Sequence, residues 1–66
     1  MRVIYDRLYR LMADSGVSTR DLAAIAGTNT IAVWLKLRGI MQWKLTEVVR
    51  ICCFFSVVDA EYLFSN

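Results

Sequence analysis

The side chains that could perform chemistry are few, and their types argue against an enzyme. The chain has no histidine, which removes the commonest general base and the commonest metal ligand. Its serines therefore have no imidazole that could activate them as nucleophiles. Among the acidic residues only Asp59 and Glu61 form a close pair, and this pair suits the start of a helix. We expect no enzymatic activity, no metal site and no cofactor.

The two cysteines, Cys52 and Cys53, are adjacent in the sequence. Neighbouring side chains on a helix point about 100° apart, so this pair is poorly placed for a disulfide. Two cysteines also cannot fill a four-ligand zinc site. We expect two reduced thiols, which fits a reducing cytoplasm. A redox-active thiol at Cys53 would have only Arg50, one turn back, as a cationic neighbour.

The composition of the 66 residues indicates one small, unusually apolar domain, residues 1–66. Hydrophobic residues make up 58% and charged residues 21%. A chain this short has a thin margin of stability, so an apolar core or a partner must support it. No stretch is apolar enough for a transmembrane helix, and the first residues lack the apolar stretch of a signal peptide. We therefore expect a cytoplasmic protein without a membrane partner.

Positive charge is concentrated in the middle of the chain. Residues 51–66 carry acidic but no basic side chains, whereas residues 18–50 are predominantly basic. The basic residues of this middle part are Arg20, Lys36, Arg38, Lys44 and Arg50. This distribution favours an anion-binding surface.

The elements that must position these residues are helices. Apolar side chains at Ile4, Leu8, Leu11 and Met12 follow a helical period, and Gly16 is a suitable stop. The stretch 18–21, Ser-Thr-Arg-Asp, is a capping box that begins a second helix. Gly27 ends that helix.

Three further helices are predicted in the second half of the chain. Asn29 is a good N-cap for a third helix that closes at Arg38-Gly39. A fourth helix is expected from near Lys44 to near Ser56, and Asp59 can cap a last turn. The fold class is therefore all-α, a compact bundle of about five short helices. The expected core residues are Leu22, Ile25, Leu37, Leu45, Val48, Val49, Cys52 and Val58, with Trp43 as an anchor.

Several stretches together resemble the helix-turn-helix domain of the phage Cro and CI repressors and their bacterial relatives, the lambda-repressor-like or XRE-type family. The resemblance covers almost the whole chain and implies a helix-turn-helix motif over roughly residues 18–38. The matching features are the spacing Ala23–Gly27–Val33, the Lys36-Leu37-Arg38-Gly39 ending, the fourth-helix pattern from Trp43 to Ile51 and the closing Tyr62-Leu63-Phe64.

This resemblance implies a sequence-specific transcriptional regulator of phage or prophage repressor type. Such a protein acts as a homodimer on an operator in double-stranded DNA, in the bacterial cytoplasm and on the nucleoid, with the second motif helix in the major groove. The positions that would face the bases are Asn29, Thr30, Ile31, Trp34 and Leu35. The positions that would contact phosphates are Thr19, Arg20, Arg38 and Lys44.

The third helix departs from the family because large apolar residues replace the polar ones that usually read bases. An alternative function is therefore a helix-turn-helix domain repurposed for protein binding, such as an antirepressor, a repressor partner or an oligomerisation module. The interface would then comprise Ile31, Trp34, Leu35, Ile40 and Met41.

Two structural alternatives remain open at this point. A register with a shorter turn would bury Ile31 and Trp34 and expose Val33 and Leu37. At the C-terminal end, Phe54, Tyr62 and Phe64 could close the core or form the dimer contact used in the repressor family. The length suits either a Cro-sized protein or a fragment of a larger repressor.

Overall fold

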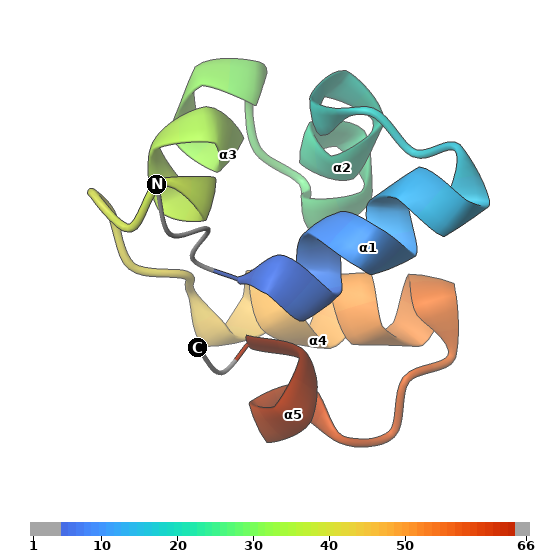
Figure 1. The fold of residues 1–66 in the computed structure, drawn as a ribbon. Coiled ribbons are helices and arrows are strands. Elements are labelled where there is room, and N and C mark those ends of the chain that lie inside the picture. Colours follow the sequence, from blue (N-terminus) through green and yellow to red (C-terminus); the bar gives the residue numbers. More distant parts are fainter. Residues whose placement is uncertain (1–4, 65–66) are drawn as a thin grey trace.

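The computed structural model describes residues 5–64, within which the chain forms five α-helices and no strand. The predicted helix residue Ile4 lies outside this range. The helices are α1 (Asp6–Ser15), α2 (Thr19–Ala26), α3 (Thr30–Leu37), α4 (Leu45–Phe55) and α5 (Ala60–Phe64) (Figure 1). The all-α prediction is confirmed.

The boundaries of α2 and α3 follow from residues that the sequence places at their ends. The Ser18 hydroxyl accepts from the Asp21 N–H and the Asp21 carboxylate accepts from the Ser18 N–H, both at 3.1 Å. The Asn29 side-chain oxygen accepts from the Ala32 N–H at 2.8 Å. Gly27 ends α2 with φ 80°, a conformation that costs glycine little. Both predicted caps are confirmed.

Helix α2 contacts both α3 and α4, while α5 contacts α1 and α4. In Figure 1, α2 and α3 lie side by side and α4 passes behind α1. The radius of gyration is 10.6 Å, close to the value of about 11 Å expected for a compact chain of this length. Helix α3 therefore lies at the edge of a compact bundle, against α2.

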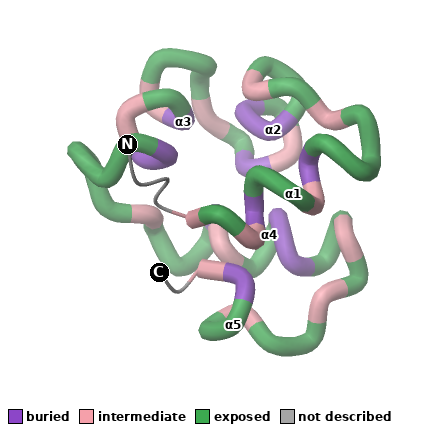
Figure 2. The backbone as a smooth tube through the Cα atoms, viewed as in Figure 1, coloured by how far each residue is buried: buried purple, intermediate pink, exposed green. Residues whose placement is uncertain are grey.

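The core draws on every helix, as the purple segments in Figure 2 show. Leu22, Leu37 and Cys52 are buried as predicted, whereas Ile25 and Val48 are only partly buried. The buried apolar residues are Leu8, Met12, Leu22, Ala23, Ala26, Val33, Leu37, Ile51, Cys52 and Leu63.

Three core predictions are wrong, and two of them concern α4. Leu45 is 78% exposed and Val49 about half exposed, because α4 turns Glu47 and Ile51 inward instead. The apolar residues of α4 cover most of its circumference, so periodicity alone could not select the inner face. Val58 is 101% exposed and lies in the connection between α4 and α5.

Burial also decides between the two registers of the third helix. Val33 is fully buried and Leu37 almost so, while Ile31 is 71% and Trp34 49% exposed. The register with Val33 inside is therefore correct, and the alternative with the shorter turn is wrong.

An aromatic cluster closes the bundle beside the start of α4. The Trp43 ring lies edge-on to Phe64 at a centroid distance of 5.3 Å and to Tyr5 at 6.3 Å. Trp43 is thus a packing anchor, as predicted. Within residues 5–64, its indole N–H is buried without an acceptor. No helix in that range is long and apolar enough to cross a membrane.

Candidate nucleic-acid interface

The outer face of α3 presents three of the five side chains that the sequence predicted to face bases. Val33, Lys36 and Leu37 occupy the inner face, so Thr30, Ile31 and Trp34 point to the opposite, exposed side. Leu35 is partly buried at the margin. The structure therefore brings Thr30, Ile31 and Trp34 together on one surface.

Asn29 lies at the start of this surface, but its side chain is engaged. Its oxygen accepts the Ala32 N–H and so satisfies one of the free donors in the first turn of α3. The residue as a whole is exposed. Asn29 is therefore primarily the residue that fixes where α3 begins.

Lys36, the basic residue within α3, is not available to a ligand. Its side chain is 2% exposed, and its Nζ donates to both carboxylate oxygens of Glu47 at 2.6 Å. Glu47 is 5% exposed and also accepts from the Lys44 backbone N–H at 2.9 Å. The sequence analysis missed this ion pair, because residues eleven apart are brought together only when α3 and α4 both pack against α2.

The electrostatics of the pair favour the ionised forms. Burial acts to raise the pKa of Glu47, but the hydrogen bonds from Lys36 and from the Lys44 N–H, with the positive charges of both lysines, outweigh it. The pKa of Glu47 is consequently below its ordinary value. The carboxylate therefore stays charged at neutral pH and holds the inner face of α3 against α4.

The predicted phosphate-binding residues lie at exposed or partly exposed positions near helix ends. Arg20 and Thr19 begin α2, Arg38 follows α3, and Lys44 precedes α4. The Arg38 guanidinium lies over the Trp34 ring at 4.6 Å from its centroid. Among residues 5–64, Arg20, Arg38 and Lys44 form no ion pair.

Arg50 is a further exposed cation, which the sequence analysis did not assign to the site. A side-chain carbon added at Gly27 would collide with its guanidinium, so Arg50 lies beside the turn between α2 and α3. Its charge is also favourable there, because the carbonyl end of α2 is partly negative. The sequence showed that the middle of the chain is basic, but it did not show that Arg50 lies beside this turn.

The exposed charge of this region has one sign. Between Asp21 and Asp59 the only acidic residue is Glu47, and it is buried and paired with Lys36. The exposed charges of α3, α4 and the loop between them are therefore all positive. Such a surface attracts a polyanion and repels a basic partner.

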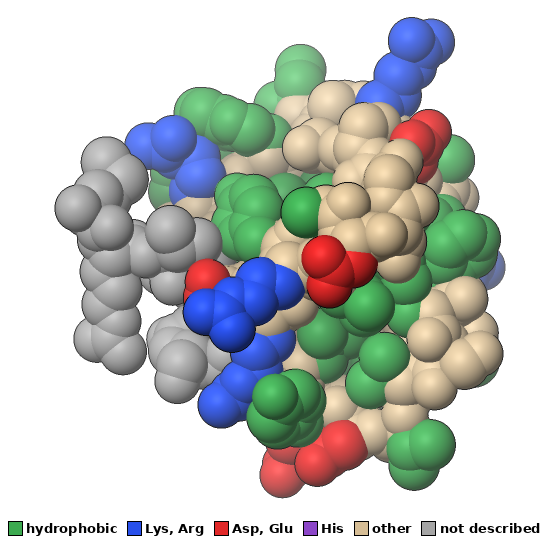
Figure 3. Space-filling model, turned by 45° about the vertical axis from the view of Figure 1, so that its right-hand side comes forward, with side chains coloured by type: hydrophobic (Ala, Val, Ile, Leu, Met, Phe, Trp, Pro, Cys, Tyr) green, Lys and Arg blue, Asp and Glu red, His purple; other side chains and the backbone are tan. Residues whose placement is uncertain are grey.

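The face that includes α1 and α2 is different. In Figure 3, cationic, acidic and hydrophobic side chains are interspersed on the visible face, and acidic side chains lie close to the adjoining cationic ones. On α1, Arg10 pairs with Asp6 at 3.1 Å. Because charges of both signs are mixed on this face, it is less suited to binding a polyanion.

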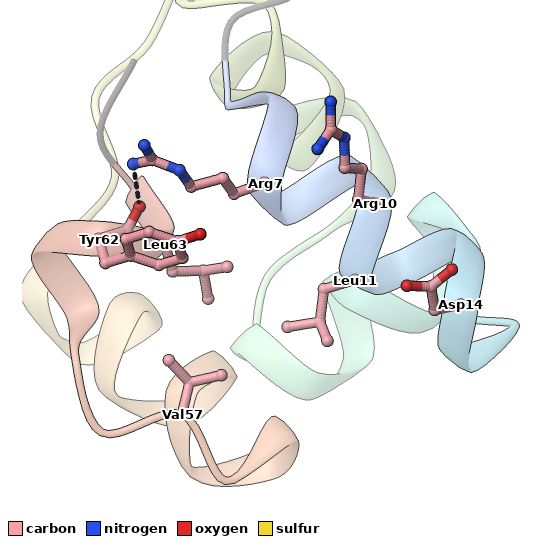
Figure 4. A pocket seen from close by; sticks show the side chains of 7 residues that line it. All are labelled: Arg7, Arg10, Leu11, Asp14, Val57, Tyr62 and Leu63. Carbon is pink, nitrogen blue, oxygen red and sulfur yellow. Dashed lines mark hydrogen bonds between the residues drawn. The ribbon is translucent and has the colours of Figure 1, made fainter.

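A hollow of about 260 Å³ lies between α1 and α5 (Figure 4). Arg7 crosses it and donates to the Tyr62 carbonyl oxygen at 2.9 Å, with its guanidinium 4.0 Å from the centre of the Tyr62 ring. The hollow is lined by Arg7, Arg10, Leu11, Asp14, Val57, Tyr62 and Leu63. The contacts between Arg7 and Tyr62 hold α5 on α1.

The remaining candidates differ in exposure. Ile40 and Met41, in the loop after α3, are exposed beside the α3 surface, as an apolar interface requires. Phe54 and Tyr62 are also exposed, whereas Phe64 packs into the aromatic cluster with Trp43. Phe64 therefore belongs to the closing edge of the core.

The cysteines have different environments. Burial, and secondarily the neighbouring Cys53, raises the pKa of the Cys52 thiol, which keeps it protonated. Cys53 is exposed, and both thiols are free. Among the described residues, no group of three cysteine, aspartate or glutamate side chains could hold a metal ion.

No protein-family model matches the chain, and no curated protein matches it.

Proposed function

We propose that the chain is a small DNA-binding transcriptional regulator in which α2 and α3 act as a helix-turn-helix motif. The observation that carries this proposal is the single sign of charge on the exposed surface of residues 22–58. DNA is the polyanion that an exposed helix flanked by cations fits best, because the major groove admits one α-helix. The regulator would repress a promoter by occupying its operator as a homodimer.

The arrangement of the residues supports the proposed direction of approach. Thr30, Ile31 and Trp34 would enter the groove, while Arg20, Arg38 and Lys44 would contact the phosphates on either side. The resemblance to the repressor family implies that Val33 contacts the first helix of the motif. Val33 is buried, and α3 packs against α2.

The test is a salt titration of binding to a random-sequence duplex. If Arg50 contacts the DNA together with Arg20, Arg38 and Lys44, four exposed cations take part, and affinity should fall about 100-fold between about 50 mM and about 200 mM salt. An affinity that does not change with salt, or no binding at the lower concentration, would refute the proposal.

A second function, protein binding, is favoured by one specific observation. Ile31, Trp34, Ile40 and Met41 leave large apolar side chains exposed on α3 and the loop that follows it. Contiguous apolar surface commonly forms the centre of a protein interface. Sedimentation of the protein without DNA discriminates between the two functions. If the bound protein is a second copy of this chain, protein binding predicts an assembly that Trp34→Ala abolishes, whereas DNA binding predicts that Trp34→Ala leaves sedimentation unchanged.

A further inference from the structure

We infer that the α3 surface distinguishes DNA sequences through the methyl groups of thymine, and only weakly through hydrogen bonds to base edges. This inference rests on the proposed DNA-binding function and names the feature of the duplex that α3 would read. Two observations support it. The exposed side chains at the centre of α3 are apolar, and the polar side chains that commonly read bases already have other partners.

The exposed side chains at the centre of α3 are apolar. Ile31 is 71% exposed in the first turn, and Trp34 is 49% exposed in the next. In the major groove, the thymine C5-methyl group is the apolar group that a base pair presents, while the other positions are donors and acceptors. Ile31 and Trp34 can therefore gain by contacting thymine, whereas against a G·C pair they would leave polar base atoms without partners.

The polar side chains that commonly read bases are held elsewhere. Bidentate recognition of adenine by asparagine uses the amide oxygen, and that oxygen of Asn29 accepts from the Ala32 N–H. Lys36 is buried against Glu47. The guanidinium of Arg38 lies over the Trp34 ring at the end of the helix. The exposed Thr30 adds a hydroxyl and a further methyl group at the start of the surface.

The charge around this surface selects duplex DNA as the occupant. The exposed side chains from α3 through α4 carry only positive charge, so a second copy of the same surface would meet like charges. Double-stranded RNA is excluded because its deep, narrow major groove does not admit a helix.

The experiment compares duplexes that differ only in major-groove methyl groups. One A·T-rich duplex contains thymine and its counterpart contains uracil. A G·C-rich duplex is prepared with cytosine or with 5-methylcytosine. Each methyl group that is contacted should change the dissociation constant about fourfold. We expect the thymine duplex to bind at least about tenfold more tightly than the uracil duplex, and 5-methylcytosine to strengthen binding to the G·C duplex.

Matched variants assign the effect to α3. Ile31→Ala should reduce the preference for thymine over uracil by about fourfold, since it removes one apolar partner. Leu45→Ala removes an equally exposed apolar side chain from α4 and should leave the preference unchanged. Because both side chains are exposed, both variants should remain folded.

The failures of the two proposals are distinguishable. Equal binding of the thymine and uracil duplexes would overturn methyl recognition and leave DNA binding intact. No binding of any duplex at about 50 mM salt would overturn the DNA-binding function and methyl recognition together.

Discussion

The Nζ atom of Lys36 lies 2.6 Å from both carboxylate oxygens of Glu47, and this buried pair joins α3 to α4 inside the protein. The same carboxylate accepts the Lys44 N–H at the start of α4. One side chain thus fixes the inner face of α3 and caps α4. The orientation of the proposed recognition surface depends on it.

Lys36→Met should destabilise the protein strongly, because it leaves the Glu47 carboxylate buried without its cation. The expected loss of unfolding free energy is about 3–5 kcal/mol, measured by urea unfolding followed by circular dichroism. This is a large part of the total stability of such a domain. The double variant Lys36→Met/Glu47→Leu should regain most of the loss, and a double variant no more stable than the single one would contradict this interpretation.

Stability should fall in acid through the same pair. Since the pKa of Glu47 is lowered in the folded protein, its contribution is complete above the ordinary glutamate pKa and is lost as the pH falls through the lower, folded value. We expect the unfolding free energy to decrease between about pH 5 and about pH 3. The informative quantity is the difference in unfolding free energy between the unmodified protein and Lys36→Met/Glu47→Leu at each pH. That variant should show a shallower decrease, and identical pH profiles would exclude a role for Glu47.

A matched pair of variants tests the register of α3. Val33→Ala should cost about 2 kcal/mol, because it creates a cavity beside α2. Ile31→Ala, two positions away and exposed, should change the unfolding free energy by less than about 0.5 kcal/mol. Thermal unfolding of both variants measures the contrast. A larger effect at Ile31 than at Val33 would mean that the helix is turned the other way.

Phosphate contacts can be tested one at a time. Arg38→Ala and Lys44→Ala should each weaken binding to all duplex sequences and lower the slope of affinity against salt by about one unit. Arg10→Ala is the control, because Arg10 lies on α1 and pairs with Asp6. Fluorescence anisotropy at several salt concentrations gives the three slopes, and equal slopes for all three variants would show that the wrong face has been assigned.

Local signals made the helix boundaries predictable from the sequence. The caps at Ser18 and Asn29 act on residues three positions away, and Gly16 and Gly27 adopt the positive φ that ends a helix. Such interactions depend on the neighbouring chain alone. The burial of Val33 and the exposure of Trp34 were also predictable, although one alternative register had to be weighed against them.

The orientation of α4 was not predictable, for a physical reason. Its sequence is apolar on most sides, so Leu45 and Val49 were as plausible in the core as Ile51. The deciding interaction is the pairing of Glu47 with Lys36, a contact between two charged residues that pattern analysis assigns to the surface. For the same reason, the sequence did not reveal that Lys36 is buried against Glu47 and so cannot bind an anion.

The helix caps also have a kinetic consequence. At Ser18, Asn29, Lys44 and Asp59, each first turn is closed by a hydrogen bond between residues three positions apart. Loops this short form on the submicrosecond timescale, and helical bundles with such local contacts fold in microseconds to milliseconds. The capped first turns should therefore form early, but helices of 5 to 11 residues gain most of their stability from packing and should persist only once the bundle assembles.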